Sequence, residues 1–142
     1  MSARTRTLQA RLDEIPYAGW LGIVAAADGS LRFTLTGDAR HLGNPVLNVW
    51  HGGILAGTLQ VAMCASLMHA GDLPLPPRLH EHTTRYVGSS PITKPLTIDV
   101  RIVKQGGRIG FVTAEARHVP QGALFEGSAV VATAQASFAG TG

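Results

Sequence analysis

Residues 51–68 read His-Gly-Gly-Ile-Leu-Ala-Gly-Thr-Leu-Gln-Val-Ala-Met-Cys-Ala-Ser-Leu-Met. Neither proline nor a charged residue occurs from position 53 to position 68, and alanine, leucine, isoleucine and methionine dominate, so the segment is expected to be a helix. It is apolar on nearly every side, and a helix of that kind in a globular protein is buried on most of its faces. The sequence therefore predicts one central buried helix over residues 53–68.

The residues before this helix predict a helix, a hairpin and a loop. An amphipathic helix is expected within residues 1–15, and Pro16 is expected to end it. Residues 22–27 and 31–36 flank an Asp-Gly pair and are expected to form a hairpin. Residues 37–50 contain a Gly-Asn-Pro sequence and are expected to form a loop.

The residues after the central helix predict four strands, over 79–88, 96–104, 109–118 and 123–138. Strands that surround one helix favour an α+β domain, in which a curved antiparallel sheet wraps around the helix. A chain of 142 residues is the size of one such domain. A sheet with so few strands leaves edges exposed, and dimerisation or higher assembly is expected to cover them.

Composition excludes several classes of protein. Hydrophobic residues make up 45% of the chain and charged residues only 15%, which argues against disorder. The longest apolar run, 52–68, is interrupted by Thr58, Gln60 and Ser66, so no membrane span is expected. The N-terminal residues have no apolar signal core, and we expect a cytoplasmic protein. The single cysteine, Cys64, excludes an internal disulfide and is expected to be a buried helix residue.

The chain is mildly basic, with a formal charge of +3. Its arginines are scattered and are not interleaved with aromatic residues, so nucleic acid is not an expected partner. A few basic residues would equally suit a phosphorylated small ligand. The histidines have no companion cysteine or carboxylate at a metal-ligand spacing, and no metal is expected.

Four motifs together carry a resemblance to a known family: Asn44-Pro45, His51-Gly52-Gly53, Tyr86-Val87-Gly88-Ser89 and Lys104-Gln105-Gly106-Gly107-Arg108. In this order of elements they resemble the PaaI-like branch of the hotdog-fold acyl-CoA thioesterases, over about residues 16–138. The resemblance implies a hotdog fold and hydrolysis of acyl-CoA, with no cofactor besides the coenzyme A of the substrate. It also implies a site between the subunits of a homodimer, or of a homotetramer that is a dimer of dimers.

The resemblance assigns the thioester carbonyl to the start of the helix. The backbone N–H of Gly52 would polarise it, since a helix N-terminus has unpaired N–H groups and a partial positive charge. Developing negative charge on the carbonyl oxygen would be stabilised there, as in an oxyanion hole. Gly53 would let the ligand approach the backbone closely. His51 would mostly order the turn, although by its chemistry alone it could act as a base.

One position departs from the family. Its catalytic Asp or Glu stands nine residues after the histidine, where this chain has Gln60, and no carboxylate occurs from position 39 to position 71. A neutral amide cannot take a proton near pH 7, so Gln60 is expected to position water or substrate. Alternatively, Gln60 fills a subunit interface without any catalytic role.

Further candidates flank these residues. Asn48 stands where the family often has glycine, and Asn44 lies in the same loop; Asn48 either caps the loop or contacts substrate. His82 shares a strand face with His80 and Thr84. Across a dimer, His82 or Thr84 would help to activate water, or His82 is simply a hydrogen-bonded strand residue.

Glu81 points to the opposite face of that strand and is not a strong candidate for a replacement base. Ser89 adjoins the position at which the family often has a serine, which is Gly88 here, and would orient the thioester or water. Arg85 and Arg108, like Lys94, would meet the phosphates of coenzyme A.

Two alternative functions follow from the same residues. The first is a non-hydrolytic protein that binds acyl-CoA or acyl groups and has lost the catalytic carboxylate. The second is a hotdog hydratase or dehydratase, which needs a histidine together with a carboxylate or an asparagine. The stretch His41-Leu42-Gly43-Asn44-Pro45 weakly resembles that pattern, but the helix lacks the acidic residue.

Overall fold

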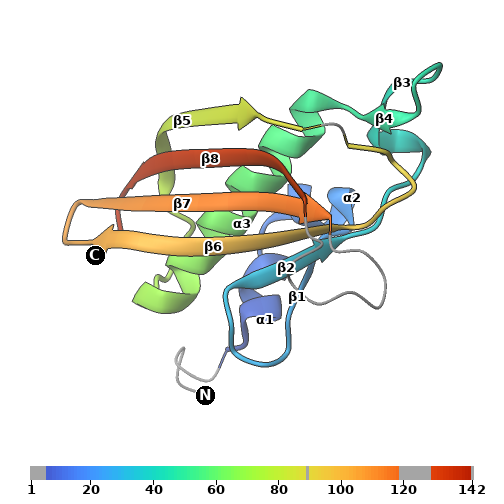
Figure 1. The fold of residues 1–142 in the computed structure, drawn as a ribbon. Coiled ribbons are helices and arrows are strands. Elements are labelled where there is room, and N and C mark those ends of the chain that lie inside the picture. Colours follow the sequence, from blue (N-terminus) through green and yellow to red (C-terminus); the bar gives the residue numbers. More distant parts are fainter. Residues whose placement is uncertain (1–5, 89, 119–128, 142) are drawn as a thin grey trace.

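The computed structural model describes residues 6–88, 90–118 and 129–141. Within them, an antiparallel sheet of six strands in the order β1-β2-β6-β7-β8-β5 curves around one long helix, α3 (Gly52–Gly71) (Figure 1). This is the predicted α+β hotdog arrangement. The strands are β1 (Val24–Ala25), β2 (Arg32–Leu35), β5 (Arg78–Tyr86), β6 (Leu96–Gln105), β7 (Ile109–His118) and β8 (Ala129–Ala139).

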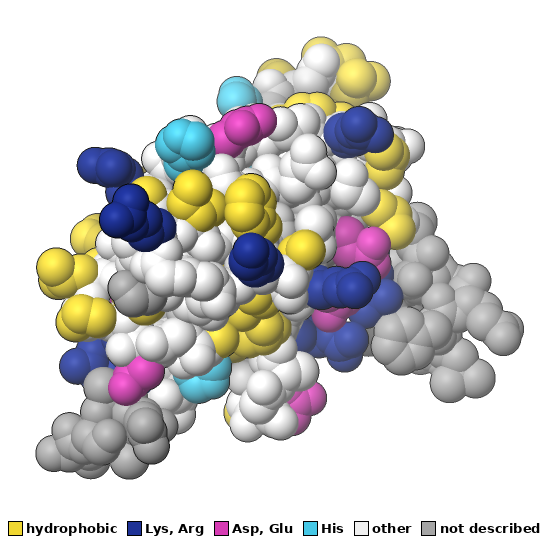
Figure 2. All heavy atoms as spheres, turned by 90° about the vertical axis from the view of Figure 1, so that its left-hand side faces the viewer, with side chains coloured by type: hydrophobic (Ala, Val, Ile, Leu, Met, Phe, Trp, Pro, Cys, Tyr) yellow, Lys and Arg dark blue, Asp and Glu magenta, His cyan; other side chains and the backbone are white. Residues whose placement is uncertain are grey.

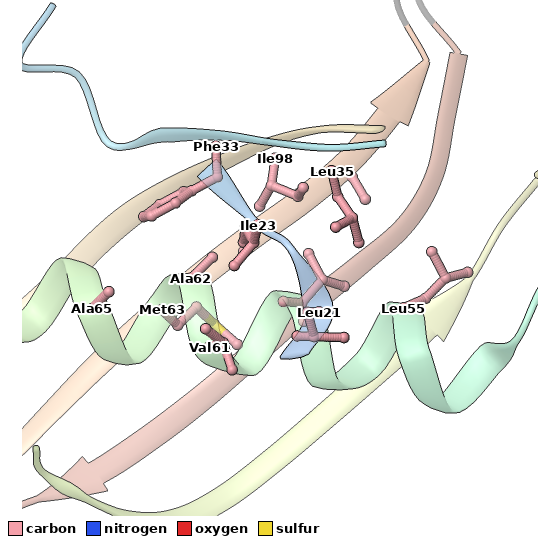
Figure 3. Packing of buried hydrophobic residues seen from close by; sticks show 14 of the residues in the cluster. Leu21, Ile23, Phe33, Leu35, Leu55, Val61, Ala62, Met63, Ala65 and Ile98 are labelled. Carbon is pink, nitrogen blue, oxygen red and sulfur yellow. The ribbon is translucent and has the colours of Figure 1, made fainter. Parts of the chain in front are cut away.

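Helix α3 begins one residue before the predicted start and ends three residues after the predicted end. Asp72, in the left-handed conformation with φ 50°, forms its C-cap. By length and composition alone α3 is apolar enough to cross a membrane, but 67% of its most apolar window is buried inside the fold. Figure 3 shows what covers it on one side: Phe33, Leu35 and Ile98 of β2 and β6 point toward Ala62 and Met63 of the helix.

The sheet presents small residues to this helix. Ala114 and Ala116 of β7 and Ala134 and Ala136 of β8 are all buried on the helix side. Alanine at these positions lets the helix lie close to the sheet, and the long side chains of α3 fill the space between them. The alternation predicted for β6 is confirmed, since Leu96 and Ile98 are buried and the next two residues of that face pack against the core.

The N-terminal prediction was only partly correct. A short helix, α1 (Leu8–Asp13), does end before Pro16, but Pro16 then begins a second helix, α2 (Pro16–Leu21). Proline is well tolerated at the first position of a helix because its missing N–H would have no partner there. Pro16 therefore starts a helix as well as marking the end of one.

The predicted loop at 37–50 contains regular structure. A turn of 3-10 helix (Ala39–His41) precedes β3 (Leu42–Asn44) and β4 (Val49–Trp50), which form a hairpin that projects from the body of the molecule (Figure 1). The last predicted strand, 123–138, is described from Ala129 onward, and its earlier part lies outside the described residues.

Candidate functional site

The N-terminus of α3 is ordered by His51. Its side chain caps the helix, and its Nδ1 atom accepts the N–H of Gly53 at 2.9 Å. Because Nδ1 is an acceptor, the neutral ring carries its proton on Nε2. The N–H of Gly52 has no partner among the described residues. The start of the helix therefore keeps a free donor at Gly52, next to one already used at Gly53.

Strand β5 ends at this same point. The Tyr86 hydroxyl donates a hydrogen bond to the backbone carbonyl of Gly52 at 2.6 Å, and its ring lies over that glycine. Figure 1 shows β5 running along α3 in the opposite direction, so that the end of the strand meets the start of the helix. Tyr86 was part of the family motif, but nothing in the sequence placed it against Gly52.

One narrow stripe of α3 is not fully buried, and we call it the α3 stripe: Gly53, Ala56, Gly57, Gln60 and Cys64. These positions recur at intervals of three and four residues and so lie on one side of the helix, while every other residue from 54 to 68 is buried. The Gln60 side chain has no hydrogen-bond partner in the described chain. The ring of Tyr17, from α2, lies over Gly57 so closely that a Cβ there would be 2.9 Å from it.

The helix side of β5 presents His82, Thr84 and Tyr86, which pair with buried alanines of β8. His82 Nε2 lies 2.6 Å from Thr84 Oγ1. Burial lowers the pKa of His82 below its usual value of 6.5, so its ring is neutral at pH 7. In the sheet, β5 is hydrogen-bonded to β8 and stands at one edge.

The expectation that His80 shares this face was wrong. A β-bulge between Leu79 and Glu81 interrupts the alternation of side chains. His80 Nδ1 instead lies 3.3 Å from Ser137 Oγ, and Ser137 lines a groove on the outer face of the sheet together with Glu81. Glu81 thus lies on the face away from α3, as its alternation with His82 predicts.

The two loop asparagines shape the hairpin before α3. Asn44 Oδ1 accepts the N–H groups of Val46 and Leu47, at 2.9 and 3.1 Å. Asn48 has a left-handed backbone, with φ 56°. Asparagine adopts this conformation more readily than other residues that have a side chain. Asn48 therefore does conformationally what a glycine would do at the same position.

The two arginines that are expected to meet the phosphates of coenzyme A lie in different parts of the structure. Arg85 lines a groove of about 540 Å³ on the outer face of the sheet, together with Asp99 and Arg101. Arg108 lies in the turn between β6 and β7. Gln105, the last residue of β6, donates a hydrogen bond to the Leu67 carbonyl in the last third of α3. Ser89 lies outside the described residues.

His41 has a structural environment. It is fully buried, and its Nδ1 accepts the N–H of Asp38 while its Nε2 lies 2.9 Å from the Leu21 carbonyl. Its ring stacks on Trp50 at 5.3 Å. With both nitrogens engaged by backbone, His41 is not placed to transfer protons as a hydratase would require. No local pattern in the sequence predicts this packing.

The described residues contain no group of three or more histidine, cysteine or acidic side chains that could hold a metal ion. On the face shown in Figure 2, lysine and arginine side chains lie in separate groups, and hydrophobic and acidic side chains lie between them. That face therefore carries no continuous basic surface of the kind that binds nucleic acid.

A curved antiparallel sheet around one long helix is the architecture of hotdog-fold proteins, and comparison with known families places the chain among them. The family model described as acyl-CoA thioesterase N-terminal domain matches residues 43–139, so the chain belongs to this family. Comparison with curated proteins gave no match.

Solved structures extend the likeness to nearly the whole chain. A protein from Chromobacterium violaceum is 27% identical, with a TM-score of 0.71, over 96% of this chain and 91% of that one. A Bacillus halodurans protein solved with CoA is 27% identical, with a TM-score of 0.67, over 87% of this chain and 74% of that one. Zebrafish thioesterase superfamily member 2 shares the fold, with a TM-score of 0.73 and 17% identity over 94% of this chain and 92% of that one.

Proposed function

We propose that the protein is a PaaI-like enzyme that hydrolyses acyl-CoA thioesters. The observation that carries the proposal is the N–H of Gly52 at the N-terminus of the long buried helix, which has no partner among the described residues. A thioester carbonyl bound there would accept this hydrogen bond and would lie in the positive field of the helix end. The negative charge that develops on its oxygen as water attacks would be stabilised. The Bacillus halodurans relative, solved with CoA, supports this ligand class.

The site is proposed to lie between two copies of the chain. Gln60 stands eight positions after Gly52, which is about 12 Å along a helix axis. The two groups of one chain are therefore too far apart to hold the same thioester. Gly52 of one copy and Gln60 of another can do so if two α3 helices lie side by side in opposite directions.

The exposed parts of the chain fit this assembly. The open edge of β5 offers unpaired backbone groups, and a second β5 in antiparallel register would continue the sheet. The same two-fold axis would bring the two α3 stripes together, and Gly53 and Ala56 would let the helices approach closely. The result is a homodimer, and a homotetramer would consist of two such dimers.

A second candidate function is binding of acyl-CoA without hydrolysis. The observation that favours it is Gln60, since the α3 stripe presents an amide where the family has a carboxylate. In this case the start of α3 would hold the thioester, and no group on the helix would activate water.

The experiment is a screen of purified protein against short-chain, medium-chain and aromatic acyl-CoAs, with Gln60→Ala and Gln60→Glu alongside. Thiol release by the wild type, reduced in Gln60→Ala, supports hydrolysis with Gln60 at the site. A wild type that binds CoA but is inert, with activity gained in Gln60→Glu, supports the binding protein. The absence of both hydrolysis and CoA binding in every variant would refute both functions. Because losing one oxyanion donor costs about 10²- to 10³-fold, the assay must resolve slow turnover.

A further inference from the structure

The antiparallel course of α3 and β5 fixes which residues lie level with each other. Tyr86 contacts Gly52, so this pair gives a common starting point. Eight residues further along α3, at about 1.5 Å each, lead to Gln60 after about 12 Å. Four residues back along β5, at about 3.3 Å each, lead to His82 after about 13 Å. By this count we expect His82, on the side of β5 that faces the helix, to lie level with Gln60.

The surroundings of His82 leave one ring nitrogen available. Its Nε2 is 2.6 Å from Thr84 Oγ1, and its Nδ1 has no partner among the described residues. When Nε2 donates its proton to Thr84, the lone pair on Nδ1 is free to accept a proton. Partial burial favours the neutral ring, and a neutral ring is the form that acts as a base.

No charged side chain of the described chain faces His82 from the elements packed against it. On that side β8 presents Ala134 and Ala136. Gln60 and Cys64, the polar members of the α3 stripe, carry no charge, since burial raises the pKa of the Cys64 thiol to about 11. Glu81 and Arg85, the charged neighbours on β5, lie on the other face.

We propose that His82 is the general base that activates water in place of the missing helix carboxylate, with Gln60 holding the water and Thr84 holding the ring. This inference rests on the proposed hydrolysis of acyl-CoA. In the step, a water oxygen bonds to the thioester carbon as its proton passes to His82 Nδ1. The tetrahedral intermediate then expels the thiolate as the C–S bond breaks, and the imidazolium returns the proton to the sulfur. The products are the carboxylic acid and coenzyme A.

The test compares the pH profiles of the wild type, His82→Gln and a matched control, His80→Gln, on the best acyl-CoA found. His82→Gln is expected to lower kcat by about 10²- to 10⁴-fold, the usual contribution of a positioned base. Because burial lowers the pKa of His82 below its usual value of 6.5, the wild type is expected to lose activity only at a pH below that value, as the ring takes up a proton. His82→Gln is expected to lose this acid limb. His80→Gln, on the same strand but directed at Ser137, is expected to keep both the rate and the limb.

Two further variants separate a catalytic role from a structural one. Adding Gln60→Glu to His82→Gln supplies a carboxylate at the family position and is expected to restore turnover. Thr84→Val removes the hydroxyl that accepts a hydrogen bond from His82 Nε2–H. This hydrogen bond stabilises the charged ring more than the neutral ring. It is therefore expected to move the acid limb to lower pH. If His82→Gln fails to fold by circular dichroism, the Thr84→Val profile decides, and an unmoved limb overturns the proposal.

The failure of this inference is distinct from failure of the proposed function. A wild type that turns over while His82→Gln keeps its rate and acid limb leaves hydrolysis standing and removes His82 from it. A wild type inert on every acyl-CoA overturns both.

Discussion

The guanidinium of Arg11 lies 2.8 Å from the carboxylate of Asp72, although only 1% of the arginine side chain is exposed. It also donates to the Leu73 carbonyl at 2.7 Å. Asp72 is the left-handed residue that ends α3, so this contact fastens α1 to the far end of the central helix. The N-terminal segment is thereby part of the structure that fixes where the helix stops.

Replacing Arg11 by methionine is expected to destabilise the fold by about 3 kcal/mol, because it leaves a buried carbonyl unpaired and removes the partner of Asp72. Urea unfolding measures the change. Arg6→Met is the matched control, since Arg6 pairs with Glu14 at the surface and such pairs contribute about 0 to 1 kcal/mol. Equal losses in the two variants would show that the contact to Asp72 adds nothing.

Gly52→Ala is expected to fold normally but to lose activity. A Cβ on Gly52 would lie 3.4 Å from the Tyr86 ring, close to ordinary contact, and alanine suits a helix better than glycine. The free energy of unfolding should stay within about 1 kcal/mol of the wild type. The same methyl group stands next to the N–H proposed to hold the thioester, so kcat/KM should fall by at least about 10-fold.

The control for Gly52→Ala is Gly107→Ala, in the turn between β6 and β7, where a Cβ would meet nothing within 4 Å. It is expected to change neither stability nor activity. If Gly52→Ala were as active as Gly107→Ala, the thioester would not bind at the start of α3.

Most of the fold was predictable because its signals are local. A helix without charge or proline, and strands with alternating apolar residues, reveal themselves over ten residues or so. What the sequence concealed depends on tertiary contacts. The bulge at His80 depends on how β5 pairs with β8, and so the face of that histidine could not be inferred from alternation. The hairpin before α3 is built from strands of two and three residues, which are too short to show any period.

Only those parts of the candidate site that lie within one segment of the chain could be predicted from the sequence. The order of His51 and Gly52 and the substitution at Gln60 were visible because they share one segment. That Tyr86 and Tyr17 lie over two glycines of that segment follows from the packing of β5 and α2 against α3, which no local pattern encodes. The same reason applies to the groove that Arg85 lines, because residues of several strands form it.

Asn48 allows a test between loop shape and substrate contact. At φ 56° glycine is free of strain, whereas alanine in this conformation costs about 1 to 2 kcal/mol. We expect Asn48→Gly to match the wild type in stability and in kcat/KM, and Asn48→Ala to be less stable by about 1 kcal/mol. Thermal unfolding and the acyl-CoA assay together check this. A stable Asn48→Gly variant with reduced kcat/KM would instead assign the amide to the substrate.

Cys64 is expected to be unreactive, which bears on whether a thiol contributes to catalysis. Burial raises its pKa from 9.0 to about 11, so at pH 8 the folded protein holds about 100-fold less thiolate than the unfolded chain. The reaction with a disulfide reagent at pH 8 should therefore be slower by about that factor in buffer than in 8 M urea.

The raised pKa of Cys64 also makes the stability of the fold depend on pH, since an unfolded cysteine releases its proton more readily. The contribution of Cys64 is constant below pH 9 and is lost as the pH rises toward 11. The difference in unfolding free energy between the wild type and Cys64→Ala should follow this curve. A fast reaction of Cys64 with the disulfide reagent in buffer would mean that the thiol is activated. Nucleophilic attack by this cysteine, one helical turn after Gln60, would then replace water activation as the chemistry of the site.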